Sequence, residues 1–431
     1  MVSESRAVWL HTFGCKANQY DTERMRQELE GRGARIVDEA GEADTAVLNT
    51  CTVTSRADAA ARRMVRKLRR EHPGLRVVVA GCSSALQAPV YRRMKGVVAA
   101  VEGHDPVAVA AAVAPESALA AADEEPIGGV LLRANERGTR GWLKIQDGCD
   151  RKCSFCATRL ARGASRSRPV EEVLAEARLL SGVHAELVLT GIHIGHYGRD
   201  LDPPATLAHL CARLLEALPA VRFRLGSIEA TEIDDELVDL LATSGGALAP
   251  HLHVPLQSGS DAVLRRMRRW HTREAYRARV LEIAARVAPL GLGADVIAGF
   301  PGETEADHAS TRALVEELPY SYLHVFPWSP REGTAAAALE DRVPQRVAAE
   351  RARELRELAA AAGRAYAAGR IGEPARVAVE TGAAGLTGDY LRVHVAGEPG
   401  TLIDAVLTGT AGALRADAAG RRALPVLKAV V

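Results

Sequence analysis

The sequence has 431 residues, of which 47% are hydrophobic and 25% are charged, and its formal net charge is +1. This length allows about three domains with large buried cores, and the balanced charge leaves any nucleic-acid contact to local clusters of basic residues. No basic segment with a long apolar core opens the chain, and no charge-free apolar run reaches the roughly 18 residues that span a bilayer. We therefore expect a cytoplasmic protein that does not contact membranes.

The first hundred residues alternate short apolar strands, at 7–14, 45–53 and 76–83, with amphipathic segments. This pattern predicts a Rossmann-like domain built on a parallel sheet, which we place at residues 1–115. Between the last two strands, the helical segment ADAAARRMVRKLRREH has its apolar residues on one face. The rest of that helix carries six basic residues, which are Arg62, Arg63, Arg66, Lys67, Arg69 and Arg70.

A stretch rich in Ala, Glu and Gly predicts a linker over residues 116–134, and a second α/β pattern follows it. Six strand candidates alternate with helical patterns, which predicts a partial (β/α)6 TIM-type barrel within residues 135–365. In such barrels the chemistry lies on loops at the carboxyl ends of the strands. The strand candidates are WLKIQDG, ELVLTGI, RFRLGSIE, HLHVPLQ, GADVIAGF and SYLHVF.

The C-terminal part begins after a long charged helix and is rich in Gly. Its strand candidates RVAVE, YLRVHV and LIDAVLTG predict a small β-barrel over residues 366–431. From Ile371 onward, six basic residues stand against six acidic ones, so its surface is not strongly basic.

Seven cysteines are present, an odd number, and in a chain without a secretory signal we interpret them as thiolate ligands rather than disulfides. Cys211 lies inside the apolar helical pattern LAHLCARLLEAL and is expected to be a buried, inert thiol. The other six cysteines form two groups of three.

The first group is Cys149, Cys153 and Cys156 in the loop DGCDRKCSFCATRLARG, directly after the first barrel strand. Three thiolates on one loop can hold three irons of a 4Fe–4S cluster and leave the fourth iron open. A closed zinc site would need a fourth Cys or His at matching spacing, and His184 and His193 lie in other elements. The spacing therefore favours a cluster over zinc or over three unrelated buried thiols.

The second group is Cys15, Cys51 and Cys82, each at the carboxyl end of a predicted parallel strand. Neighbouring strand ends of a parallel sheet meet at one crevice, so the three thiols should lie close together. The alternative is that each cysteine merely packs against its own strand end.

The C-x3-C-x2-C spacing, with Phe155 before its last cysteine, resembles the radical S-adenosylmethionine superfamily. The segments TFGCKANQYDTE, VLNTCTVTSRAD and VVAGCSS resemble the N-terminal domain of the methylthiotransferases, where these three cysteines bind an auxiliary 4Fe–4S cluster. The C-terminal part resembles their small RNA-binding TRAM domain. The resemblance continues in order through GCDRKCSFCATRLARGASRSRP, LTGIHIGHYG, RLGSIEATEI, HLHVPLQSGSDAVLRRMRRWHT, DVIAGFPGETEADH and FPWSPREGT.

Within that family, NTCTVT and the GCK opening are most similar to the branch that acts on tRNA N6-threonylcarbamoyladenosine. The resemblance implies two 4Fe–4S clusters, S-adenosylmethionine as cofactor, and replacement of the base's C2 hydrogen, beside the anticodon, by a methylthio group. One S-adenosylmethionine would methylate sulfur at the auxiliary cluster, and a second would yield the radical that abstracts hydrogen. It also implies a tRNA substrate, a reducing electron donor and a sulfur source, and we expect a monomer.

Three other functions stay open at this point. The substrate could be isopentenyladenosine tRNA or a ribosomal protein, or the chain could be a non-catalytic iron-sulfur protein that binds RNA or carries sulfur. Adenine C2 has no acidic proton, so general acid–base catalysis cannot perform the reaction, and we assign no catalytic residue beyond the cluster ligands.

Two sets of contact residues are expected, the first from position and from the resemblance, which implies that Thr190 and Gly191 support the methionine end of the cofactor, and the second, of arginines, from position and charge. For S-adenosylmethionine we expect residues of the cysteine loop and the barrel strand ends, although Glu229 or Gln257 could instead make ordinary interior hydrogen bonds; the set is Phe155, Thr190, Gly191, Ser227, Glu229, Gln257 and Ile297. For RNA phosphate we expect the basic helix and the arginine run at 265–269, although each run could be a solvated face; the set is Arg62, Arg63, Arg66, Arg266 and Arg269. For the carboxylate of the substrate we expect an arginine that follows the cysteine loop, although each of these could instead hold tRNA phosphate; the set is Arg159, Arg162, Arg166 and Arg168.

Overall fold

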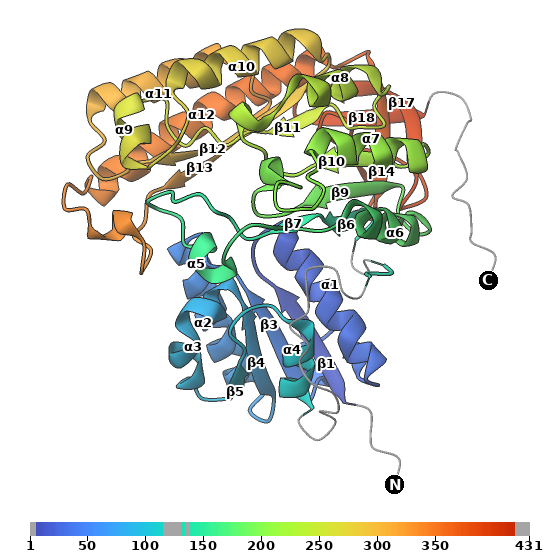
Figure 1. Cartoon of the computed structure of the whole chain (residues 1–431), viewed down its shortest axis with the longest axis vertical. Coiled ribbons are helices and arrows are strands. Elements are labelled where there is room, and N and C mark those ends of the chain that lie inside the picture. Colours follow the sequence, from blue (N-terminus) through green and yellow to red (C-terminus); the bar gives the residue numbers. More distant parts are fainter. Residues whose placement is uncertain (1–5, 115–130, 135–137, 419–431) are drawn as a thin grey trace.

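The computed structural model describes residues 6–114, 131–134 and 138–418. It has an N-terminal sheet domain, a central partial barrel and a C-terminal closed β-barrel, as the sequence predicts (Figure 1). The predicted linker, 116–134, lies mostly outside the described residues, and the predicted domain boundaries stay a prediction. No described helix is both long enough and apolar enough to cross a bilayer.

The N-terminal sheet has five parallel strands in the order β2-β1-β3-β4-β5. Strand order reverses between β1 and β3, so a crevice opens at the carboxyl ends of these strands. The sequence pattern missed β2 and β5, which are short strands at the two edges. The bounds are β1 Ala7–Thr12, β2 Arg35–Val37, β3 Thr45–Thr50, β4 Arg76–Gly81 and β5 Val97–Ala100.

Helices cover both faces of this sheet. α1 (Lys16–Gly31) and α4 (Pro106–Val113) share one apolar cluster with it, and α2 (Ser55–Glu71) and α3 (Cys82–Arg92) share the other. Thr54 is the N-cap of α2, and its hydroxyl accepts a hydrogen bond from the Ala57 amide. Its apolar side is buried, so its arginines face outward, as its periodicity predicts.

The central part contains the six predicted parallel strands, arranged as two three-stranded sheets, β10-β9-β6 and β11-β12-β13. Parallel bridges Phe223 to Leu248 and Ser227 to His253 join the two sheets into one partial barrel. Its outer layer of helices encloses the largest apolar core of the described residues (Figure 1). The strands are β6 Gly141–Lys144, β9 Glu186–Thr190, β10 Arg222–Leu225, β11 His251–His253, β12 Gly291–Ala298 and β13 Tyr322–Pro327; the helices are α6 Val170–Ser181, α7 Leu207–Ala217, α8 Asp235–Thr243, α9 Asp261–Arg266, α10 Arg273–Arg286, α11 Glu305–Glu317 and α12 Gln345–Gly369.

The C-terminal part is a closed five-stranded barrel in the order β14-β15-β16-β18-β17. It packs against the start of the central strands, because Arg222 and Arg224 of β10 donate hydrogen bonds to carbonyl oxygens in and after β15. Its strands are β14 Pro374–Glu380, β15 Ala384–Thr387, β16 Arg392–His394, β17 Leu402–Thr410 and β18 Ala413–Ala418.

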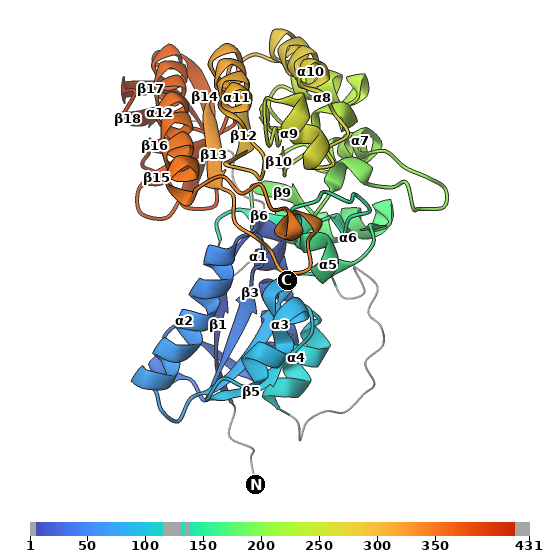
Figure 2. The ribbon, with the colours of Figure 1, turned by 90° about the vertical axis from the view of Figure 1, so that its left-hand side faces the viewer.

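The N-terminal domain meets the central barrel through α1, which packs against β6 (Figure 2). Lys144 of β6 forms an ion pair with Asp21 of α1 at 2.7 Å, and Arg331, after β13, pairs with Asp58 of α2 at 2.5 Å. These buried charge pairs lie on either side of the strand ends that carry the first three cysteines.

Candidate functional site

The strand ends of the N-terminal sheet carry Cys15, Cys51 and Cys82. Cys15 is the N-cap of α1, Cys51 directly follows β3, and Cys82 is the first residue of α3. Asn18 connects the loops that carry Cys15 and Cys51. Its side-chain amide donates hydrogen bonds to the carbonyl oxygens of Phe13, at 2.8 Å, and Thr50, at 3.0 Å.

The loops approach so closely that two glycines are required between them. Gly14 has φ +97°, and a Cβ added to it would lie 2.5 Å from Cys51 Sγ. Gly81 has φ +88°, and its added Cβ would lie 2.3 Å from the Asn49 amide oxygen. Side chains other than glycine would therefore be strained and would clash, so the three strand ends can lie side by side only with glycine at both positions.

Burial dominates the chemistry of these thiols. Burial, together with the neighbouring Cys15 and Cys82, raises the pKa of Cys51 to about 12, while the Val53 amide opposes the shift. Burial also raises the pKa of Cys82, against the charge of Arg162. Without metal, the thiols of Cys51 and Cys82 are therefore protonated at neutral pH, and metal binding at these two residues must release their protons.

The second group lies on the loop between β7 (Gln146–Asp147) and α5 (Thr158–Arg162). The Cys149 amide donates to the Gly163 carbonyl at 3.0 Å and closes this loop at its base. His193 Nδ1 lies 3.5 Å from Cys149 Sγ, and Arg269 Nη1 lies 3.6 Å from Cys153 Sγ. The three cysteines are partly exposed, so a ligand can reach them.

The donor sets fit iron-sulfur clusters better than single ions. Among the described residues, neither cysteine trio has all its sulfur atoms within 4.8 Å of one another, as ligands of a single ion would be. The seventh cysteine, Cys211, is 1% exposed in α7, so it is a buried thiol as predicted and offers no fourth ligand. Three thiols per site suit a 4Fe–4S cluster with one open iron; at the second site the structure also brings His193, which lies in another element, within 3.5 Å of Cys149 Sγ.

A histidine–carboxylate cluster beside Cys149 was not predicted. Glu232 Oε2 lies 2.7 Å from His193 Nε2, Glu232 Oε1 lies 3.0 Å from His196 Nε2, and Arg151 pairs with the same carboxylate at 2.9 Å. Burial opposes the charge of Glu232, but the hydrogen bonds from His193 and Arg151 lower its pKa to about 2. The only available signal was the position of both histidines just after a barrel strand.

The residues proposed for S-adenosylmethionine lie at or near the barrel strand ends and the cysteine loop, in different surroundings. Thr190 ends β9, and Gly191 comes so close to the Gln146 carbonyl that an added Cβ would lie 2.7 Å from its oxygen. Ser227 is exposed after β10, and Gln257 has a left-handed backbone with φ +67°. These placements leave their cofactor contacts as proposals.

The remaining candidates are engaged by protein groups. Phe155 packs edge-on against Phe300, with 6.5 Å between ring centroids, in a small apolar cluster that Ile297 joins. Glu229 forms an ion pair with Arg269, and its contact with the cofactor stays a prediction.

Three of the arginines proposed to contact RNA or the substrate are buried in ion pairs, so they do not face solvent here, and their proposed contacts stay a prediction. The side chains of Arg162 and Arg168 are 0% exposed and that of Arg269 is 3% exposed. Sequence position shows where a charge lies along the chain but not that carboxylates of other elements enclose it. The other six are at least partly exposed, and they are Arg62, Arg63, Arg66, Arg159, Arg166 and Arg266.

Comparisons with known proteins agree with this geometry. Residues 7–103 match the uncharacterized protein family UPF0004, and residues 143–315 match the radical S-adenosylmethionine superfamily. The structure of the radical S-adenosylmethionine methyltransferase TsrM from Kitasatospora setae is similar in fold, with a TM-score of 0.55 and 16% identity over 77% of each chain. The barrel and its cysteine loop therefore define a radical S-adenosylmethionine enzyme.

Relatives of similar sequence show to which family of radical S-adenosylmethionine enzymes the chain belongs. The threonylcarbamoyladenosine tRNA methylthiotransferase MtaB of Bacillus subtilis is 38% identical over 84% of this chain and 82% of its own length. The protein of the same name from Thermotoga maritima is 32% identical over 87% of each chain. The tRNA-2-methylthio-N(6)-dimethylallyladenosine synthase of Frankia casuarinae is 34% identical over 80% of this chain and 66% of its own length. The chain belongs to the radical S-adenosylmethionine methylthiotransferase family that modifies tRNA.

Proposed function

We propose that the protein replaces the C2 hydrogen of N6-threonylcarbamoyladenosine, beside the anticodon of a tRNA, by a methylthio group. The observation that carries this proposal is the share of each relative's own length that aligns with this chain. Four relatives named for this substrate align over 81–87% of their own length, whereas the relative named for dimethylallyladenosine aligns over 66% of its length. Sequence identity does not separate the two groups, so the choice of substrate needs its own test.

We place one 4Fe–4S cluster at Cys15, Cys51 and Cys82 and one at Cys149, Cys153 and Cys156. With bound S-adenosylmethionine, these groups would supply the sulfur, the methyl group and the hydrogen-abstracting radical. The protein's part is to present three thiols at each site and to hold both sites against one domain interface. No protein base is needed at C2, because its hydrogen leaves as an atom and not as a proton.

The threonylcarbamoyl group carries a carboxylate, which needs a cation or several donors once it leaves water. Arg162 and Arg168 cannot supply it, because buried carboxylates already engage them. Arg159 of α5, three residues after Cys156, is half-buried and makes no ion pair or hydrogen bond with any described side chain. We propose that Arg159 binds this carboxylate.

Lys16 is a second cation at the site without a carboxylate partner among the described residues. It follows Cys15 and lies 5.8 Å from the centre of the Tyr390 ring. Burial lowers the pKa of Lys16 to about 8, so it is still mostly charged at neutral pH. The exposed Arg346 of α12 serves as the comparison residue, because Glu350 of the same helix pairs with it at 2.7 Å.

The anticodon arm needs a basic surface for its phosphates, and α2 supplies one. Arg63 and Arg66 are exposed on this helix. Arg66, Arg69 and Arg70 also line a surface hollow of about 370 Å³ together with Met94 and Lys95. We propose that tRNA phosphate contacts this face, and that the C-terminal barrel, with its balanced charge, contributes less.

The test is mass spectrometry of nucleosides from tRNA of a deletion strain. We expect loss of the 2-methylthio group from threonylcarbamoyladenosine and its return when the gene is restored. Restoration with Arg159→Gln or Lys16→Gln should lower this product, while Arg346→Gln should not. If the deletion strain instead lost the 2-methylthio group from isopentenyladenosine, the proposed substrate would be wrong. If its tRNA were unchanged and a ribosomal protein lost a methylthio group, the assignment to tRNA would be wrong.

A non-catalytic role is tested separately with reduced, purified protein. We expect it to cleave S-adenosylmethionine to 5′-deoxyadenosine, and Arg159→Gln should keep this cleavage, because the substrate carboxylate takes no part in it. A protein that binds tRNA but never cleaves the cofactor would be a binding or sulfur-carrying protein.

A further inference from the structure

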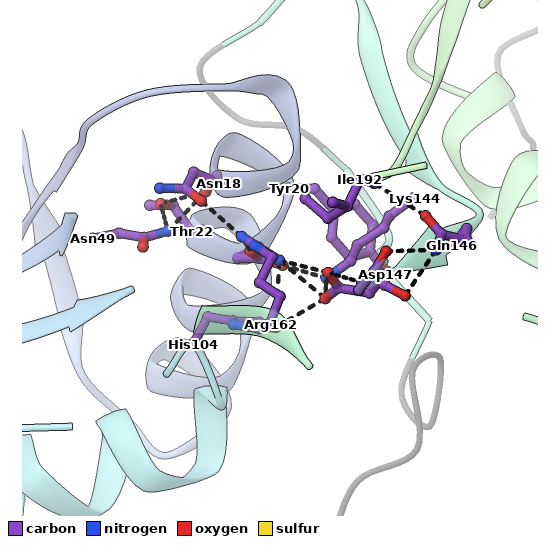
Figure 3. A network of polar contacts seen from close by, with 12 residues as sticks. Asn18, Tyr20, Thr22, Asn49, His104, Lys144, Gln146, Asp147, Arg162 and Ile192 are labelled. Carbon is purple, nitrogen blue, oxygen red and sulfur yellow. Dashed lines mark hydrogen bonds and ion pairs between the residues drawn. The ribbon is translucent and has the colours of Figure 1, made fainter. Parts of the chain in front are cut away.

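Arg162 belongs to the loop of one cysteine site and contacts a cysteine of the other. It ends α5, on the loop of the second trio, yet its Nε donates a hydrogen bond to Cys82 Sγ of the first trio at 3.1 Å. The residue is completely buried at the interface between the N-terminal domain and the barrel (Figure 3).

All the donors of this guanidinium are used. Nη2 donates to Asn18 Oδ1 at 2.7 Å and to Asp21 Oδ2 at 2.6 Å, both on α1. Nη1 donates to the two carboxylate oxygens of Asp147 at 2.9 and 3.0 Å. Asp147 lies two residues before Cys149, and its Oδ1 also accepts the Gly148 amide at 2.8 Å. One side chain thus joins the base of the second cysteine loop to a ligand candidate of the first site.

The charges around Arg162 balance. Lys144 pairs with Asp147 at 2.6 Å (Figure 3) and with Asp21 at 2.7 Å, so two cations face two carboxylates. His104 Nε2 also lies 3.0 Å from Asp147 Oδ2. Removing one member of such a buried set leaves an uncompensated charge beside Cys82. The sign of that charge depends on which member is removed.

We propose that Arg162 is a positioning residue that fixes the second cysteine loop against the first site and sets the reduction potential of the cluster held by Cys15, Cys51 and Cys82. This inference rests on the proposed cluster at that trio and is independent of the choice of substrate. Hydrogen bonds to ligand sulfur and nearby positive charge favour the reduced form of an iron-sulfur cluster, which carries the extra negative charge. Arg162 supplies both.

The test uses the full chain with Cys149, Cys153 and Cys156 replaced by Ala, so that only the first cluster forms. Its one-electron reduction is followed by electron paramagnetic resonance in a potentiometric titration. Arg162→Gln should lower the reduced-to-oxidised ratio at a fixed potential about tenfold, a shift of about 59 mV to lower potential. Asp21→Asn removes a negative charge from the same network and should shift the potential upward.

Matched variants separate tuning from a purely structural role. Arg168 is equally buried and pairs with Glu176 at 2.9 Å, but no hydrogen bond joins it to a cysteine among the described residues. Arg168→Lys should therefore leave the potential unchanged. Arg162→Lys keeps the charge but loses the Nε–H donor, so its potential should lie between those of the parent and Arg162→Gln.

If Arg162→Gln does not retain iron, the proposal is tested with Arg162→Lys and Asp21→Asn. The first should lower the reduction potential and the second should raise it. Equal potentials in these variants, or shifts of the same sign, would overturn the proposal. No tRNA is present, so this failure would leave the substrate proposal intact. Loss of methylthiolation on threonylcarbamoyladenosine with normal potentials would count only against the proposed function.

Discussion

Arg269 and Cys153 repeat the relationship between Arg162 and Cys82. Nη1 of Arg269 lies 3.6 Å from Cys153 Sγ, and Glu229 balances the charge of that guanidinium. Each cysteine trio therefore has one buried arginine against a sulfur atom and a carboxylate behind it. This arrangement suits a ligand set that becomes negatively charged when its three thiols ionise, because a buried anion needs a nearby cation.

Replacing Arg269 should damage the second cysteine site without weakening tRNA binding. In Arg269→Gln we expect cleavage of S-adenosylmethionine to fall at least tenfold, because the cation beside Cys153 is lost. The affinity for tRNA should stay within about twofold, because a buried side chain cannot reach phosphate. Arg266→Gln, an exposed neighbour, is the control for charge. A large loss of tRNA affinity in Arg269→Gln alone would contradict its placement.

The two cysteine trios should each account for half of the iron. Anaerobically purified protein should hold about eight irons in two 4Fe–4S clusters. Changing Cys149, Cys153 and Cys156 together to Ala should leave about half, and so should changing Cys15, Cys51 and Cys82. Cys211→Ala should leave the iron content unchanged. Iron and zinc are measured by inductively coupled plasma mass spectrometry, and stoichiometric zinc would rule out both cluster assignments.

The close approach at Gly14 should make it intolerant of any side chain. Gly14→Ala should lose most of the iron of the first site, because the added methyl group would occupy the space of Cys51 and its φ of +97° strains any other residue. Gly31→Ala is the matched control, since nothing lies within 4 Å of an added Cβ there. The measurement is iron per chain in protein whose Cys149, Cys153 and Cys156 are replaced by Ala. A normal iron content of Gly14→Ala would show that the loops can separate.

The basic face of α2 should give tRNA binding part of its dependence on salt. Arg63→Ala and Arg66→Ala should each reduce the slope of log affinity against log salt by about one, if each contacts one phosphate. Arg346→Ala on α12 is the control, because that exposed arginine is held by Glu350 within its own helix. Fluorescence anisotropy with labelled anticodon arm at several salt concentrations measures the slopes. Unchanged slopes would move the phosphate contacts to another surface.

Cys211 should make the protein sensitive to alkali. Complete burial, and to a lesser extent Asp234, raises its pKa from 9.0 to about 12. Below pH 9 the thiol is protonated in both folded and unfolded chains, so its contribution is constant. As the pH rises from about 9 towards 12, only the unfolded chain ionises, and stability falls by up to about 1.4 kcal/mol per pH unit. The fall in thermal midpoint between pH 8 and pH 10 should be smaller in Cys211→Ala than in the parent, and equal slopes would contradict the raised pKa.

Much of the fold could be predicted because its signals are local. The six barrel strands lie in short segments with two or more apolar residues each, separated by helical patterns, and α2 shows a clear helical period with Ala61, Val65 and Leu68 buried. β2 and β5 were missed because they have only three and four residues, too few for an alternating pattern to appear. The convergence of the first three cysteines could also be predicted, since it follows from parallel strand order alone.

The partners of buried charges could not be predicted in the same way. Arg162 and Arg168 follow the cysteine loop as any solvated arginines would, but Asp21 comes from α1 and Glu176 from α6. Such pairs depend on how elements distant in sequence pack, which no local pattern records. The same limit explains why the contact between His193 and Cys149 was missed.

The two cysteine groups differ in how far apart their members lie along the chain. Cys149, Cys153 and Cys156 share one loop, whereas Cys15, Cys51 and Cys82 come from the ends of β1, β3 and β4. A set of ligands within one loop can gather early in folding, but a set spread over three strands forms only when those strands have paired. The first site therefore reports completed folding of the N-terminal domain. During maturation, iron should enter the second site before the first.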